Sequence, residues 1–162
     1  MAFDAFVQIS GIEGESTDEK HPGWIEVITF DTETRQKTSS TASSAGGAGS
    51  ERADFTALTF SKLVDKASPK LALACAAGTH IDTIVLEIYR AGAEKIKYME
   101  YKLSNCMITR VVSAAEPGEF PAEIISADFG KIVWSYTRQR RSGGVAAGQI
   151  AGGWDREKNC KI

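Results

Sequence analysis

Apolar residues alternate with polar ones in several short runs of this chain, and this period of two is typical of half-buried β-strands. Phe3, Ala5, Val7 and Ile9 form the first such run. Later runs of the same kind cover residues 54–63, 81–90, 95–112 and 123–136. Turn signals separate them, at Ala91-Gly92-Ala93, where we expect a hairpin, and at Glu116-Pro117-Gly118. The pattern predicts a mainly β fold with antiparallel strands.

The run Trp24–Phe30 carries apolar side chains on both faces of the predicted strand. Trp24, Ile28 and Phe30 share one face, and Ile25 and Val27 share the other. A strand of an isolated barrel would have one wet face. This run therefore predicts a second layer on the outside, either the helix or another subunit.

Three strands near the C-terminus give more specific predictions. On residues 95–112 one parity is apolar and should face the core, at Met99, Tyr101, Leu103, Met107 and Val111. On residues 123–136 the apolar parity changes across Gly130, which predicts a β-bulge there. Residues 145–154 are rich in Gly and Ala and should form an edge strand of small side chains.

One segment has the pattern of a helix, at Ser68–Ala77. We expect Ser68 to be the N-cap, Pro69 to occupy the first helical position and Gly78 to end the helix. Leu71, Ala74 and Cys75 fall on one face, so this helix should lie against the strands. Together the strands and the helix predict an antiparallel β-barrel with one flanking α-helix.

A low-complexity segment of Ser, Thr, Ala and Gly runs from Thr38 to Ser50 within a longer predicted loop at residues 36–52. It has no large apolar side chain that could anchor it to a core. It is either an idle flexible insertion or a loop that becomes ordered when it docks on a partner. The sequence leaves both interpretations open.

Composition and charge narrow the possible partners and compartments. The 162 residues predict one domain, 1–162, and the net charge of -2 disfavours a nucleic-acid partner. The basic run Arg138–Arg141 is interpreted as a solvated turn. We expect no signal peptide, no membrane insertion and folding in the cytosol. Cys75 and Cys106 should be reduced core residues and Cys160 an exposed thiol.

No pattern of catalytic or ligand-binding residues emerges. His21 and His80 lack partners at metal-ligand spacing, and Cys75 with His80 lacks an orienting third group. The glycines of Gly46–Ser50 lack the Lys of a phosphate-binding loop. We therefore predict no catalytic residue, no cofactor and no metal, and a binding or structural protein in place of an enzyme.

Four segments in order carry a resemblance to a known family. They are residues 2–6 with Gly14-Glu15-Ser16-Thr17, His21–Val27, Asp65–Leu71 with Gly78–Ile81, and Phe129–Tyr136 with Gly152-Gly153-Trp154-Asp155. Together they resemble the haemolysin-coregulated protein (Hcp) family, the tube protein of bacterial type VI secretion. The resemblance runs almost end to end.

The resemblance implies a homohexameric ring with a central channel. Rings would stack into a tube that a contractile sheath expels, with secretion effectors carried and chaperoned in the lumen. The partners implied are further copies of the chain, effectors, and the sheath and spike proteins of the same machine. The protein would be cytoplasmic before firing and then secreted, without a cleavable signal peptide.

The same resemblance suggests surfaces of assembly, although only loosely. The loop at 36–52 is similar to an arm between neighbouring rings, with candidate ring–ring contacts at Gln36, Lys37, Thr38, Ser39, Glu51 and Arg52. Trp24 and Trp154 are candidate subunit-interface residues, and Trp134 is interpreted as a buried barrel residue. A phage-type tail tube protein and a monomeric ligand-binding β-barrel stay as alternatives.

Overall fold

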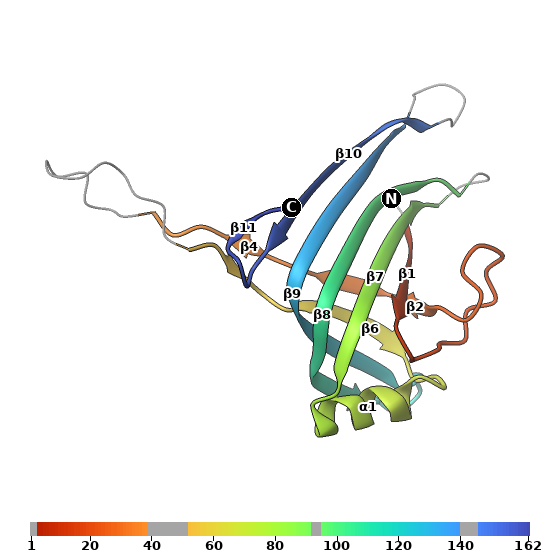
Figure 1. Cartoon of the computed structure of the whole chain (residues 1–162). Helices are drawn as coiled ribbons and strands as arrows, with labels where there is room; N and C mark the ends of the chain where they lie inside the picture. The colour runs from red at the N-terminus through yellow and green to blue at the C-terminus, as the bar shows by residue number, and fades with distance from the viewer. Residues whose placement is uncertain (1–2, 39–51, 92–94, 140–145) are drawn as a thin grey trace, which may run out of the picture.

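The computed structural model describes residues 3–38, 52–91, 95–139 and 146–162. Within these ranges the chain forms one helix and a set of antiparallel strands (Figure 1). The strands of the N-terminal half are β1 (Phe3–Ile9), β2 (Ile25–Val27), β3 (Thr29–Asp31), β4 (Thr34–Arg35), β5 (Asp54–Phe55) and β6 (Leu58–Leu63). After them come α1 (Ser68–Ala77), β7 (His80–Arg90), β8 (Lys97–Ala114), β9 (Ala122–Gln139), β10 (Ala146–Asp155) and β11 (Cys160–Lys161).

The main sheet curls round so that its two ends approach each other. Its strands follow the order β11-β10-β9-β8-β7-β1-β2, and β6 joins β9 to β3. The pairings therefore lead from β1 through β7, β8, β9 and β6 to β3. The ladder is interrupted at Ile28, where β2 ends and β3 begins, so the barrel is not a closed hydrogen-bonded cylinder. The predicted class, antiparallel β with one flanking helix, is confirmed.

Strand β9 has two different neighbours along one edge. Its first part, Ala122–Ala127, pairs with β6, whereas Lys131–Gln139 pairs with β10. The opposite edge of β9 pairs with β8 over almost its whole length. The sheet therefore forks at residues 128–130, and we call this place the fork. In Figure 1 β10 rises from the fork beside the upper part of β9, while α1 lies across the lower end of the strands.

The predicted helix is present, but its first turn differs from the prediction. Ala67 and not Ser68 is the N-cap, and it makes no side-chain cap bond. The Ser68 hydroxyl instead accepts a bond from the Asp65 N–H (3.0 Å) and donates one to Glu123 Oε2 (2.7 Å). Gly78 ends the helix in the left-handed conformation (φ 61°), as expected.

The inward face of α1 joins one apolar core with the strands. Leu71 and Ala74 are buried in it, whereas Cys75, predicted as core, is only half-buried. Cys106 is fully buried, and burial raises the pKa of its thiol to about 12, which makes it an unreactive core residue. Cys160 is exposed, as predicted.

The predicted core parity of β8 holds up to Leu103 and again at Val111, which packs against the core, but it is wrong between them. Met107 is 44% exposed, while Cys106 and Ile108 are buried. The change of face occurs at Asn105, which takes a left-handed φ of 55°. The pairs on either side, Ser104 with Lys131 and Cys106 with Phe129, keep one register. The left-handed conformation of Asn105 thus rotates the strand, so that the even-numbered Cys106 and Ile108 face the core after it.

The bulge predicted at Gly130 is likewise absent from the β8–β9 register there. The register shift in this pair lies between Ile108 and Arg110 instead. Because β8 and β9 change face together at the fork, the apolar parity of β9 switches without an inserted residue. A pattern of parity alone cannot distinguish these two causes.

The run Trp24–Phe30 is not one strand but two, β2 and β3. Ile25 and Val27 are buried, whereas Ile28, at the break, is 51% exposed. The Ile28 N–H bonds to the carbonyl of Ser61 (2.8 Å), which holds the break against β6.

No helix in the described part of the chain is long and apolar enough to cross a membrane.

A buried ion pair fixes β6, β9 and the start of α1 to one another. Lys62 is only 1% exposed, and its Nζ donates to Glu123 Oε2 (2.8 Å) and lies 2.9 Å from Asp65 Oδ1. Burial acts to raise the pKa of Glu123, but bonds from Lys62 and Ser68 outweigh it and hold that pKa below its usual range. The Glu123 carboxyl therefore stays ionised at neutral pH.

Replacing Lys62 alone should destabilise the fold strongly. Lys62→Met leaves the buried Glu123 carboxylate without its cation, and we expect a loss of about 3 to 5 kcal/mol in the free energy of unfolding. Denaturant unfolding measures this loss. Lys66→Met is the matched control, because Lys66 pairs with Glu13 on the surface, and it should change stability by less than about 0.5 kcal/mol. Equal losses for the two variants would contradict this account.

Gly14 should not tolerate a side chain. A Cβ there would lie 2.4 Å from the backbone oxygen of Trp24 and 2.8 Å from Cα of Ile25, and neither backbone atom can move aside cheaply. We expect Gly14→Ala to cost about 1 to 3 kcal/mol in denaturant unfolding. Gly152→Ala is the control, because a Cβ there meets nothing within 4 Å. A Gly14→Ala protein as stable as this control would show that the contact is not tight.

Candidate functional site

Two short strands form the root of an arm that leaves the barrel. β4 and β5 pair only with each other, Thr34 opposite Phe55 and Arg35 opposite Asp54. The Thr56 N–H bonds to the Glu33 carbonyl (3.0 Å), and the Glu33 N–H bonds to Thr56 Oγ1 (2.9 Å). In Figure 1 this ribbon points away from the curled sheet. We call residues 33–38 and 52–56 the arm root.

Arg156 fills the fork of the sheet and touches the arm root. Its backbone N–H donates to the carbonyl of Gly130 (2.8 Å), and its guanidinium donates to Asp128 Oδ1 and the Phe129 carbonyl, each at 2.6 Å. These three acceptors are the residues of β9 that lie between its two neighbours. Arg156 thus supplies the hydrogen bonds that neither β6 nor β10 can supply there.

The same guanidinium lies over one ring of the barrel and one ring of the arm root. Its carbon lies 4.9 Å from the ring centroid of Phe129 and 5.6 Å from that of Phe55, which is a residue of β5. Cation–π contacts of this kind are worth about 0.5 to 2 kcal/mol. Arg52 donates a bond to the backbone oxygen of Arg156. Side chain and backbone of Arg156 therefore both hold the arm root in place.

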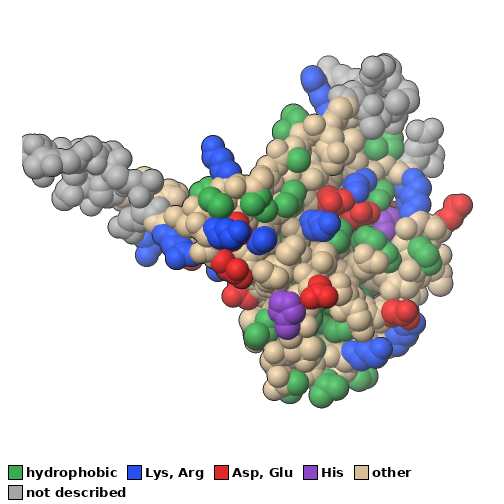
Figure 2. Space-filling model, viewed as in Figure 1, with side chains coloured by type: hydrophobic (Ala, Val, Ile, Leu, Met, Phe, Trp, Pro, Cys, Tyr) green, Lys and Arg blue, Asp and Glu red, His purple; other side chains and the backbone are tan. Residues whose placement is uncertain are grey.

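An open groove of about 760 Å³ lies between the arm root and the fork. Charged side chains of both signs line it, Lys37, Arg52 and Arg156 against Asp54, Asp128 and Glu157. In Figure 2 blue Lys and Arg side chains gather where the arm meets the body. The groove is suited to polar contacts with another surface.

The candidate contact residues of the arm are described in part. Gln36, Lys37, Thr38 and Arg52 are exposed on the arm root. Ser39 and Glu51 lie outside the described residues, as does most of the low-complexity segment. Sequence reasoning missed Arg156, because its partners are distant in sequence and no local pattern marks it.

The three tryptophans are all half-buried. Trp134 stacks on Phe55 (centroids 6.4 Å apart), and it and Trp154 pack against the core. Trp24 meets the ring of His21 edge-on at 4.8 Å. Each keeps some exposed surface, so the prediction that Trp24 and Trp154 contact a second subunit stays a prediction.

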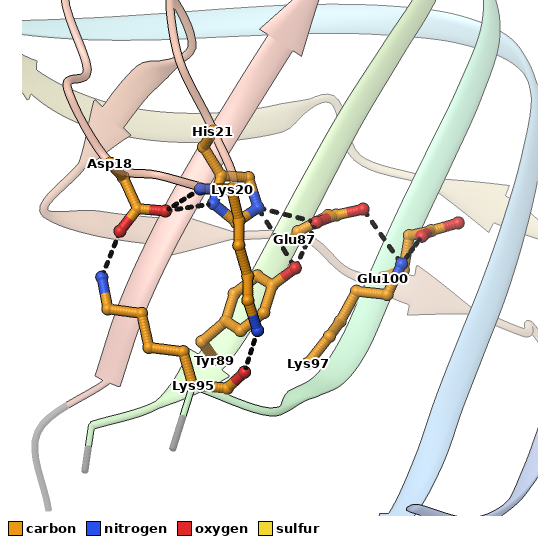
Figure 3. A network of polar contacts seen from close by, with 8 residues as sticks. All are labelled: Asp18, Lys20, His21, Glu87, Tyr89, Lys95, Lys97 and Glu100. Carbon is orange, nitrogen blue, oxygen red and sulfur yellow. Dashed lines mark hydrogen bonds and ion pairs between the residues drawn. The ribbon is translucent and has the colours of Figure 1, made fainter. Parts of the chain in front are cut away.

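A second polar cluster lies at the other side of the barrel, around His21 (Figure 3). The ring of His21 is stacked on Phe6 with centroids 4.3 Å apart. Its Nδ1 lies 2.9 Å from Asp18 Oδ1, and its Nε2 lies 2.9 Å from Glu87 Oε2 and 3.1 Å from the hydroxyl of Tyr89. The loop after β1 is thereby tied to β7.

Two lysines complete what we call the His21 cluster. Lys95 donates to Asp18 Oδ2 and lies 3.5 Å from Asp4 Oδ2. Lys97 donates to Glu87 Oε1 (3.0 Å) and to Glu100. The bonds from Lys95 and then His21 hold the pKa of Asp18 well below its usual range. Burial acts to raise the pKa of Glu87, but its bonds from His21, Tyr89 and Lys97 hold it below that range.

The cluster has no arrangement that indicates catalysis. Within the part of the chain that is described, no group of three or more His, Cys, Asp or Glu side chains could hold a metal ion. His80 is exposed and lies 3.4 Å from Asp82, and it does not meet His21. The sequence indicated no metal-ligand partners for His21, and its two carboxylates were missed; the spacing of Asp18 and His21 by three residues was the only local signal for them.

Comparison with known proteins identifies the family. Residues 6–136 match the family model described as type VI secretion system effector, Hcp. The protein hcp1 of Pseudomonas aeruginosa is 30% identical over 163 residues, covering 99% of each chain.

Solved structures agree over the full length. A structure of a type six secretion system protein has a TM-score of 0.92 and 30% identity, covering 99% of this chain and 100% of that one. Hcp1 from Salmonella typhimurium has a TM-score of 0.78 and 28% identity, with both chains covered completely. A type VI secretion system effector from Yersinia pestis has a TM-score of 0.74 and 28% identity over 94% of this chain and 99% of that one. The chain therefore belongs to the Hcp family of type VI secretion proteins.

Proposed function

We propose that this chain is the tube subunit of a type VI secretion machine, forming hexameric rings that stack and are expelled by the sheath. The observation that carries the proposal is the end-to-end likeness to Hcp proteins, with a TM-score of 0.92 over 99% of the chain. Effectors held in the lumen, and sheath and spike proteins, would be its partners. It acts as a structural carrier in place of an enzyme, and it is cytoplasmic before firing and secreted afterwards.

The outer edge of β10 supports assembly into rings. β11 pairs with this edge only at Trp154 and Asp155, so among the described residues no strand pairs with the outer edge of Gln149–Gly152, whose other edge pairs with β9. Beside this edge Ile150 is 68% exposed, and Tyr136 opposite it is also exposed. A free strand edge with apolar side chains is a liability that a second copy would remove. Trp24 and Trp154 are also proposed as interface residues, because each is only half-buried and tryptophan is common at subunit interfaces.

The arm is proposed as the contact between stacked rings. Gln36, Lys37, Thr38 and Arg52 stand exposed at the arm root, and Ser39 and Glu51 belong to the same loop. Cations and carboxylates alternate around the groove beside them, which suits polar contacts with another ring. A root held by Arg156 would present these residues in one orientation in every subunit.

The native mass tests the proposed ring. Light scattering of the purified protein should give the mass of about six copies, and negative-stain images of the same sample should show rings with a central hole. A ring that closes on itself leaves no free subunit interface, so addition of single subunits should stop at the mass of the ring as the protein concentration rises. A monodisperse monomer over a wide range of protein concentration would contradict the proposal.

Arg156 should matter more for stacking than for ring formation. Arg156→Lys keeps the charge and the backbone bonds but loses the planar group that lies over the rings of Phe129 and Phe55. We expect an unchanged ring mass and a severalfold decrease in the amount of protein released into the culture medium relative to the amount in the cells. Arg138→Lys, at an exposed arginine near the end of β9, is the matched control. Release at the control level would rule out this role of Arg156.

A further inference from the structure

Both ring nitrogens of the buried His21 face carboxylates. The side chain is 1% exposed, and its two nitrogens lie 2.9 Å from Asp18 Oδ1 and from Glu87 Oε2 (Figure 3). Phe6 covers one face of the ring, and Trp24 and Tyr89 meet it edge-on at 4.8 Å. Both ring nitrogens therefore have protein partners, and neither contacts solvent.

Only the doubly protonated ring can make both contacts. A neutral imidazole has one N–H, so one of its nitrogens would turn a lone pair towards a carboxylate oxygen. The Tyr89 hydroxyl does not resolve this conflict, because it donates to the same Glu87 oxygen (2.7 Å). If the hydroxyl turned to His21 instead, no proton would remain between Nε2 and Glu87.

The charges of the cluster balance only when His21 is a cation. Three carboxylates meet there, Asp18 from the loop, Glu87 from β7 and Glu100 from β8. Two lysines, Lys95 and Lys97, are bonded to these three carboxylates. One negative charge of the cluster is therefore not balanced by a lysine.

The remaining charged groups lie at the rim of the cluster. Asp4 of β1 is 3.5 Å from Lys95, and Lys20 donates its side-chain N–H to the Lys95 carbonyl (2.9 Å). Neither contacts the imidazole. A cationic His21 supplies the missing charge at the centre of the cluster.

The neighbours of His21 keep their charge at neutral and mildly alkaline pH. The bond to Asp18 raises the pKa of Lys95. Burial lowers the pKa of Lys97, but its bonds to Glu100 and Glu87 outweigh this and raise it. Burial and the bond to Glu87 raise the pKa of Tyr89. These three groups keep their protons, and Asp18 and Glu87, whose pKa values are lowered, stay ionised.

We propose that His21 is a structural imidazolium that latches the loop after β1 onto β7, and that raising the pH opens the latch by removing its proton. The loop carries Asp18 and His21 and leads directly into Trp24 and β2, so opening loosens the packing of Trp24 and Phe6. The latch is a property of the single chain. It therefore stands or falls independently of the proposed ring.

The sign of the pH dependence follows from proton linkage. The folded chain holds a proton on His21 that the unfolded chain releases, so the unfolded state binds fewer protons and stability falls as pH rises. With one proton involved, the folding equilibrium constant falls by at most about tenfold per pH unit. The stabilisation is complete below the pH of about 6.5 at which a free histidine titrates. It is lost as the folded-state imidazolium loses its proton.

Nitrogen NMR of the imidazole and denaturant unfolding between pH 6 and pH 9.5 test the latch. We expect His21 to show two N–H groups at pH 7 and the wild type to lose stability above that pH. His21→Gln should lack this loss and be less stable than the wild type at pH 7. His80→Gln, the matched control at the exposed histidine, should follow the wild-type curve.

A second variant keeps the test decisive if His21→Gln does not fold. Glu87→Gln replaces one carboxylate by an amide that can donate to a neutral ring, so its His21 should lose the proton at lower pH than in the wild type. A wild-type ring with one N–H at pH 7 would overturn the proposal. Parallel stability curves for the wild type and Glu87→Gln across the range would also overturn it.

Discussion

Strand β9 must serve two neighbours along one edge, and the rest of the architecture depends on this constraint. β6 takes its first part and β10 its last, which leaves Asp128, Phe129 and Gly130 between them. Backbone groups at such a place need partners from outside the ladder. Arg156 provides them, and because its guanidinium also stacks on Phe55, the arm leaves the barrel where the sheet forks. Arg156 thus bonds to β9 where the sheet forks and also fixes the position of the arm.

Two polar clusters hold the parts of the chain that the apolar core does not fix. Lys62 and Glu123 join β6 to β9 beneath the start of α1, and the His21 cluster joins the loop after β1 to β7 and β8. Each pairs buried charges with several hydrogen bonds, which is the condition under which buried charge is tolerable. Such networks specify geometry more than they add stability. The proposed ring, in which each subunit would match identical neighbours, would require this kind of specification.

The sequence predicted those features of the fold that depend on residues close together in the chain. Alternation located the strands, the Ala-rich segment and Gly78 located the helix, and motifs in order indicated the family. It failed where the cause is distant. The core parity of β8 changes at Asn105 because β8 and β9 turn together, and Ser68 leaves the N-cap role because Glu123 and Asp65 engage its hydroxyl. Arg156 and its partners come together only in the folded chain, and of the partners of His21 only Asp18 lies near it in the sequence.

We propose that the arm root, held by Arg156, directs the arm of each subunit towards the next ring. An electron-microscopy reconstruction of the stacked tube would show where the arm lies. We expect the segments 33–38 and 52–56 to contact a neighbouring ring, with the Arg156 guanidinium still over the rings of Phe129 and Phe55. A tube in which these segments lie against their own subunit, or face solvent, would contradict the account.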